Sequence, residues 1–166
     1  EFDFVYSGSL NRGKVIWDML HHFKAQMKTS TLLVVGTVPN EIHEMFGTVP
    51  NIHFVGRLKY ESVPDAITRA KYGLNIMPDI YPFNIQTSTK VLEYCAARMP
   101  VISTNYAWIK TFEKESHGSF FYLHNSFDNL NRENLEKFSF AIPSMQNYEW
   151  NNIISQSQLF DFLDHI

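Results

Sequence analysis

Short apolar runs alternate with helical patterns along most of this chain, and this alternation limits the available folds more than any other feature. Apolar runs bounded by glycine, proline or polar residues predict strands at 3–8, 31–36, 51–56, 72–78, 100–104 and 119–123. Helical patterns separate these runs at 14–27, 39–46, 62–70, 88–98 and 107–115. Strands that alternate with helices form right-handed βαβ units. The pattern predicts an α/β fold: a Rossmann-like, doubly wound parallel six-stranded sheet with helices on both faces.

The length and the C-terminal pattern predict one domain with a tail. The chain has 166 residues, of which 45% are hydrophobic, enough to build one full core. From Phe127 the pattern stays helical but becomes more polar, with a break near 142–143, so we expect a helical tail at 127–166. Tyr148 and Trp150 are expected to anchor it to the core or to a partner domain. The chain begins inside a predicted strand without a start methionine, which suggests a piece of a larger protein.

Composition and charge exclude several classes of function. The net charge is −3 and no long run of like charge is present, which argues against a general nucleic-acid binder. The one cysteine, Cys95, excludes a disulfide framework and fits a reducing compartment; we expect a small buried side chain there. No apolar run reaches the roughly 18 residues of a membrane span. The histidines lack the spacing of metal ligands, so we expect no metal site.

The first motif, GSLNRGKV, begins at Gly8. It has the spacing of a phosphate-binding Walker loop, but Val15 stands where that loop needs a hydroxyl to ligate magnesium. What remains is a strand, a tight turn, Lys14 and the start of a helix, whose free amides favour an anion. Two interpretations stay open: an anion site, or an ordinary strand-to-helix turn with an exposed lysine.

The second motif, QTSTKVLEYCAARMP, begins at residue 86. Thr87, Ser88 and Thr89 precede Lys90 where a helix is predicted to start. Hydroxyls and free amides at such a position suit a diphosphate. The alternative is that one of the three hydroxyls caps the helix and no ligand is involved.

The same helix carries one carboxylate of interest, Glu93. Val91, Leu92, Cys95 and Ala96 form the predicted buried stripe, so Glu93 is expected to point elsewhere. A carboxylate there could accept two hydrogen bonds from the hydroxyls of a ribose. The alternative is a solvated helix charge.

Taken in order, these stretches resemble the C-terminal, donor-binding half of a GT-B glycosyltransferase of the large retaining family four, the glycosyl transferases group 1. The resemblance is carried by YSGSLNRGK, TLLVVG, NIHFVGRLKYESVPDAITRAKYGLNIMP, STKVLEYCAARMPVIST and the terminal YEW. It covers about residues 3–125 well and the tail loosely. Each piece alone is weak, and their order and spacing together are fairly specific.

The resemblance implies roles for the first half of the site. Gly8 corresponds to the glycine that lets the backbone approach the donor phosphate, and Lys14 to a lysine that pairs with the diphosphate. Gly56, Arg57 and Leu58 fall where family members contact the nucleotide base through backbone groups.

The second motif would complete that site. Thr87–Thr89 match the segment whose amides and hydroxyls hold the diphosphate, and Glu93 matches the second acid of a paired-glutamate motif, which binds the ribose. Lys90, together with Lys14, would stabilise the departing diphosphate.

Two departures from the family pattern fall at the predicted site. Ser9 replaces the arginine that often follows the first glycine, and Arg12 could supply that charge instead. Ile85 stands where the first acid of the paired motif would face the transferred sugar, which leaves the sugar's identity open.

The resemblance implies a hexosyltransferase that moves a sugar from a UDP- or GDP-linked donor to a hydroxyl of a glycan or lipid-linked glycan. It suggests polysaccharide, capsule or other cell-envelope synthesis, in the cytoplasm and at the inner face of the membrane, with no metal or other cofactor. The N-terminal domain that would carry the acceptor is absent from this chain, so we expect donor binding with little or no turnover. Two alternatives remain: a non-catalytic docking module (a pseudoenzyme), and an enzyme for an unrelated phosphorylated ligand.

Overall fold

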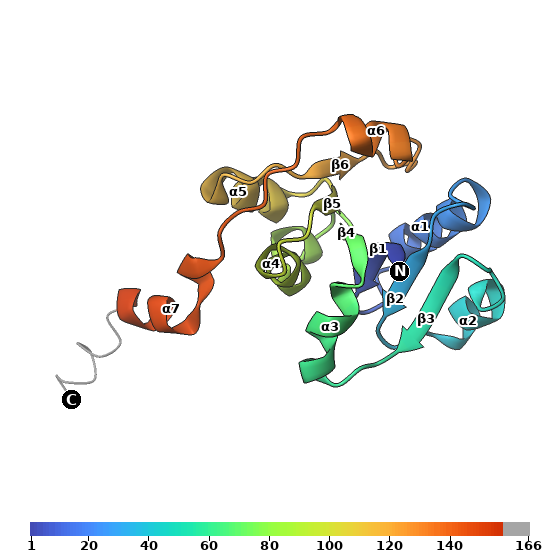
Figure 1. Cartoon of the computed structure of the whole chain (residues 1–166), viewed down its shortest axis with the longest axis horizontal. Helices are drawn as coiled ribbons and strands as arrows, with labels where there is room; N and C mark the ends of the chain where they lie inside the picture. Colours follow the sequence, from blue (N-terminus) through green and yellow to red (C-terminus); the bar gives the residue numbers. More distant parts are fainter. Residues whose placement is uncertain (158–166) are drawn as a thin grey trace.

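A parallel sheet forms the centre of the molecule in the computed structural model, which describes residues 1–157 (Figure 1). The sheet has six strands in the order β3-β2-β1-β4-β5-β6, and every pairing is parallel. The strands are β1 (Phe2–Ser7), β2 (Leu32–Val35), β3 (Ile52–Gly56), β4 (Ala70–Asn75), β5 (Val101–Thr104) and β6 (Phe121–Leu123). The chain thus builds outward from β1 in both directions, which confirms the predicted doubly wound, Rossmann-like fold.

Helices cover both faces of the sheet because alternate residues of each strand point to opposite sides. Phe4 and Tyr6 of β1 join one core cluster with α1, whereas Val5 joins a second cluster with α4 and α5. The helices are α1 (Lys14–Ala25), α2 (Asn40–Phe46), α3 (Val63–Ile67), α4 (Thr89–Ala96), α5 (Ala107–Ser116), α6 (Arg132–Lys137) and α7 (Trp150–Gln156). None of the helices in the described part of the chain has the length and apolar character that crossing a membrane requires.

The predicted boundary between the helix at 62–70 and the strand at 72–78 lies too late in the chain. α3 covers only 63–67, and Ser62 makes no side-chain capping bond. Residue 70 instead pairs with Phe2 as the first residue of β4, and the amide of Phe2 donates to the carbonyl of Arg69. The sheet needs these backbone groups, and its hydrogen bonds outweigh the helical pattern of the side chains.

The predicted helical tail is only partly helical. Between α6 and α7 the chain has no α-helix: it forms one antiparallel bridge, between Ser119 and Ala141, and then a short 3₁₀ turn (Gln146–Tyr148). Tyr148 then contacts the Phe112 ring of α5, with 5.7 Å between ring centroids. Figure 1 shows α7 lying away from the sheet at the end of this segment. The rest of the predicted tail, 158–166, lies outside the described residues.

A buried tyrosine fixes α4 over the centre of the sheet. The amide of Ser7, at the end of β1, donates to the hydroxyl of Tyr94 across 2.9 Å. The Tyr94 ring crosses β4 at Gly73, where an added Cβ would lie only 2.4 Å from the ring. The absence of a side chain at Gly73 therefore lets α4 approach the sheet, and this approach places the start of α4 beside the end of β1.

Candidate functional site

The candidate site lies at the carboxyl ends of the neighbouring strands β1 and β4, where the connections of the chain leave in opposite directions. The chain winds from β1 to β2 on one side and returns to β4 on the other. In open α/β sheets, ligands bind in the crevice at such a switch point. The loop between β1 and α1 and the loop between β4 and α4 both begin at this edge. These are the two loops that contain the motifs singled out in the sequence.

Lys90 is the most unusual side chain at this edge, because it is a buried lysine without a partner. Only 8% of it is exposed, and its Nζ has no hydrogen-bond partner among residues 1–157. Nζ lies 4.7 Å from the centroid of the Tyr6 ring, and Cε lies 3.4 Å from where a Cβ on Gly8 would be. The two predicted turns therefore meet at Gly8 and Lys90. Burial, with a smaller contribution from the charge of Arg12, lowers the pKa of Lys90 to about 7.

Arg12 brings a second positive charge to the same place. Its guanidinium carbon lies 4.9 Å above the ring of Phe83, which belongs to the loop before α4. Its buried Nε lacks a hydrogen-bond partner in the described residues, as does the side-chain oxygen of Asn84. Two adjacent cations whose nitrogens are unpartnered favour an anion between them, since burial without a partner is costly for a charged group.

The start of α4 contributes free amide groups. Ser88 occupies the N-cap position but does not cap the helix; its hydroxyl donates to Asn75 Oδ1 across 2.9 Å. The Asn75 amide donates in turn to Ser103 and Tyr106, both at 2.9 Å. No side chain caps α4, so the simple-cap interpretation of the three hydroxyls is wrong. The amides of Val91 and Leu92 donate to the Ser88 carbonyl, whereas those of Thr89 and Lys90 have no partner in the described residues and remain available to a ligand.

Glu93 lies one turn beyond Lys90, half-buried. Burial raises the pKa of its carboxyl group, while the charge of Lys90 opposes that shift. The predicted buried stripe of this helix is partly wrong, because Ala96 is exposed and Leu92 only half-buried. The buried residues of α4 are Lys90, Val91, Tyr94 and Cys95. The contact of Tyr94 with the sheet turns the helix so that its first buried side chain is a lysine.

Lys14 does not join this cation pair in the described structure. Its side chain is 85% exposed and its Nζ lies 2.6 Å from a carboxylate oxygen of Asp18, one turn along α1. Its role toward a diphosphate stays a prediction from the resemblance. Gly8 has a φ of 137° at the end of β1, and Ser9 is exposed, with its carbonyl accepting a hydrogen bond from the Tyr6 hydroxyl.

The predicted base-contact segment follows β3. Gly56 ends that strand with a φ of 73°, a left-handed conformation that favours glycine. Arg57 is exposed, and Leu58 packs against the second core cluster. Of the predicted hydroxyls, Thr87 and Thr89 are exposed at the start of α4. The structure does not test their contact with a nucleotide, and their roles stay predictions from the resemblance.

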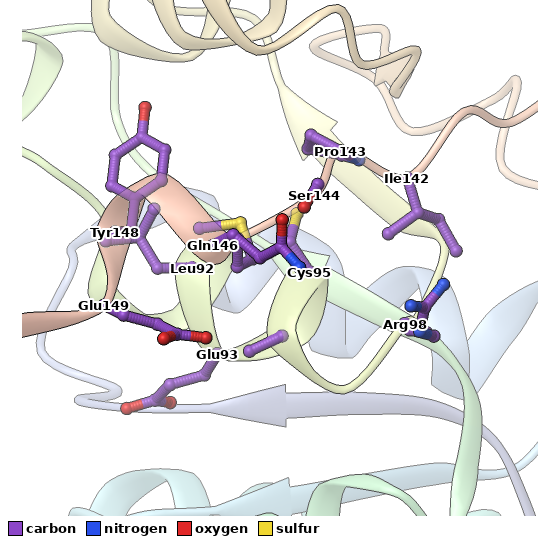
Figure 2. Close-up of a pocket in the computed structure, with 12 residues that line it drawn as sticks. Leu92, Glu93, Cys95, Arg98, Ile142, Pro143, Ser144, Gln146, Tyr148 and Glu149 are labelled. Carbon is purple, nitrogen blue, oxygen red and sulfur yellow. The ribbon is translucent and has the colours of Figure 1, made fainter. Parts of the chain in front are cut away.

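A large cavity lies on the outer face of α4 (Figure 2). It measures about 820 Å³ and is enclosed by α4 and the segment 142–149. Figure 2 shows Glu93 and Glu149 at one end of it and Arg98 at the other. Unlike the cation pair, it holds no unpartnered buried side-chain nitrogen or oxygen of the described residues. We therefore place the candidate site at the cation pair. Within residues 1–157, no three His, Cys, Asp or Glu side chains cluster so as to hold a metal ion.

Three residues that build this site were missed in the sequence. Tyr6 and Phe83 place aromatic rings beneath the two cations, and Asn75 holds the hydroxyl of Ser88. A signal for Asn75 was present, because it is a polar residue inside the apolar run YGLNIMP. Nothing local distinguishes Tyr6 and Phe83 from ordinary core aromatics.

Comparison with known proteins gives one family and one fold. The model of the family described as glycosyl transferases group 1 matches residues 1–133. AviGT4, a glycosyltransferase involved in avilamycin A biosynthesis, superposes with a TM-score of 0.59 at 17% identity, over 84% of this chain and 42% of its own. Anabaena Alr3699/HepE in complex with UDP and glucose gives 0.67 at 10% identity, over 100% and 49%. The chain thus spans less than half of either structure, and no curated protein matches it in sequence.

Proposed function

Because the chain belongs to the glycosyl transferases group 1 family, we propose that the cation pair of Lys90 and Arg12 binds the diphosphate of a nucleotide-sugar donor. The observation that carries the proposal is the pair itself, Lys90 and Arg12, each with a buried nitrogen that has no partner among the described residues. The uncapped start of α4 lies beside Lys90. A diphosphate would supply the missing partner to both side chains and to the free amides.

The proposed reaction moves a hexose from a UDP- or GDP-linked donor to a hydroxyl of an acceptor glycan, with retention of configuration. Negative charge builds up on the diphosphate as the bond between sugar and phosphate loosens, and fixed positive groups stabilise that charge. Lys90, Arg12 and the α4 amides are the groups placed to do so here, and Lys14 would have to leave Asp18 to join them. We assign the work of charge neutralisation to these groups rather than to a metal. The acceptor would belong to a polysaccharide or cell-envelope glycan and would bind to a second domain.

Calorimetry with UDP, GDP, ADP and inorganic pyrophosphate tests this function. At least one of the nucleotides should bind the chain at millimolar concentration or below, and HepE, solved with UDP and glucose, makes UDP the first to try. Glu93→Ala should weaken nucleotide binding by about 1–3 kcal/mol, because two ribose hydroxyls would lose the carboxylate that accepts their hydrogen bonds. The same variant should leave pyrophosphate affinity unchanged. A folded chain that binds neither nucleotide nor pyrophosphate would instead support a docking module, and nucleotide binding that ignores Glu93 would indicate a different pocket.

The affinity for a nucleoside diphosphate should fall as the pH rises above 7. Burial lowers the pKa of Lys90 to about 7 in the free chain, and a bound diphosphate favours the protonated amine and raises that pKa. Binding above pH 7 therefore takes up a proton, and affinity should decrease by up to about tenfold per pH unit until the pKa of the complex is reached. Calorimetry in buffers of different ionisation enthalpy measures the proton uptake. A Lys90→Met variant should lose the dependence, and a flat profile for the unmodified chain would contradict the assignment.

A further inference from the structure

A fully buried asparagine lies beside the start of α4. Asn75 ends β4, none of its surface is exposed, and its side chain makes three hydrogen bonds of 2.9 Å, to Ser88, Ser103 and Tyr106. Resting on the function proposed above, we infer that Asn75 is a positioning residue, which holds the Ser88 hydroxyl away from α4 and so keeps the amide of Lys90 free for the diphosphate. Asn75 acts through Ser88 and does not itself touch the ligand.

Ser88 has the backbone of a helix cap but does not make the capping bond. It directly precedes the first helical residue, and its extended backbone (φ −90°, ψ 99°) is typical of an N-cap position. The hydroxyl of such a serine usually accepts from the amide two or three residues further on, here that of Lys90 or Val91. The Val91 amide already donates to the Ser88 carbonyl across 3.0 Å, whereas the Lys90 amide has no partner in the described residues. A capping hydroxyl would therefore compete with the diphosphate for the Lys90 amide.

The directions of the hydrogen bonds around Asn75 leave its side chain one orientation. The Ser103 hydroxyl donates its hydrogen to the carbonyl of Thr104 across 2.7 Å, so toward Asn75 its oxygen can only accept. The NH₂ group of Asn75 must therefore face Ser103, and its Oδ1 faces Ser88. Because Asn75 is fully buried, turning the Ser88 hydroxyl toward α4 would leave that oxygen unpaired away from water. The cost of an unpaired buried oxygen typically exceeds the gain from one helix cap, so the hydroxyl stays on Asn75.

Calorimetry on the whole chain with UDP and inorganic pyrophosphate tests the inference. Asn75→Leu keeps the branched shape of the side chain but cannot hold the Ser88 hydroxyl, which should then cap α4. Both ligands should bind about fivefold more weakly, because they must displace a cap of typical strength. Hydrogen exchange followed by NMR should also show slower exchange of the Lys90 amide in the free variant than in the free unmodified chain. If the leucine variant does not fold, Asn75→Val takes its place, because valine is favoured in strands.

A second substitution separates positioning from a merely structural role. Alanine at position 88 cannot cap α4, so in the Ser88→Ala background Asn75→Leu should no longer weaken the binding of pyrophosphate. An asparagine that only supports the fold would instead cost the same affinity in both backgrounds. Asn51→Leu is the matched control, because Asn51 is also buried, directly precedes β3 at the opposite end of the sheet, and donates to three backbone carbonyls within 3.1 Å. It should lower the thermal unfolding midpoint and leave both affinities unchanged.

The outcomes of these measurements distinguish the inference from the proposed function. If UDP binds with the Lys90 dependence described below but Asn75→Leu binds it as tightly as the unmodified chain, only the inference is overturned. The same conclusion follows if Asn75→Leu costs equal affinity with serine or alanine at position 88, or if it leaves the exchange of the Lys90 amide unchanged. If the folded chain binds neither nucleotide nor pyrophosphate, the proposed function and this inference are overturned together.

Discussion

Replacing Lys90 with methionine should weaken the binding of a nucleoside diphosphate by about 10- to 100-fold. A hydrogen bond to a charged group contributes about 1.5–3 kcal/mol, and each 1.4 kcal/mol corresponds to about a factor of ten. The Nζ of Lys90 is buried beside Gly8 and lacks a partner in the described residues, so a ligand gains the whole interaction. Methionine keeps the unbranched apolar stem of the side chain and is only one atom shorter. The variant should therefore fold, and its thermal unfolding midpoint provides the check.

Two further lysines show whether the effect is specific. Lys71→Met makes the same change near the opposite, amino end of β4, where Lys71 is paired with Asp3, and it should leave the affinity unchanged. Lys14→Met should have a smaller effect than Lys90→Met, because Asp18 holds the Lys14 amine in the free chain. If Lys14→Met instead causes the greater loss, the family resemblance assigns the diphosphate lysine correctly and Lys90 has only a structural role.

Replacing Gly73 with alanine should destabilise the chain by about 1–3 kcal/mol, the usual cost of forcing extra atoms into a packed core. The new Cβ would lie 2.4 Å from one ring carbon of Tyr94 and 2.8 Å from another, far inside van der Waals contact. Tyr94 is fully buried and its hydroxyl accepts the hydrogen bond of the Ser7 amide, so the ring has no free direction in which to move. Urea denaturation of both proteins measures the change in unfolding free energy.

The clash can be isolated with a second substitution. Tyr94→Leu removes the ring and will itself be destabilising, since a large buried side chain and its hydrogen bond are lost. In that background, however, Gly73→Ala should cost much less than it does alone, because the atoms that it meets are gone. A cost that is equal in both backgrounds would show that the contact between residue 73 and the ring does not limit the packing of α4.

The elements of the sheet were predictable because a strand buried on both faces must be apolar at nearly every position. TLLVVG and PVIST are such runs, and they form β2 and β5. The helix prediction for 62–70 failed because a distant strand, and not the local pattern, decides the structure there. Its last residues satisfy a helical pattern locally, but the backbone there is needed by β1, which is almost 70 residues away in the chain.

The candidate site also has parts that the sequence predicts and parts that depend on the tertiary structure. By itself, the sequence determined the α/β class and the two turns, because turn chemistry and hydrophobic periodicity act over a few neighbouring residues. Only the tertiary structure decided which lysine is buried: Tyr94 packs across Gly73 and turns Lys90 inward, while Lys14 pairs with Asp18 at the surface. Burial and pKa depend on contacts between residues far apart in the chain, and no local pattern records those contacts.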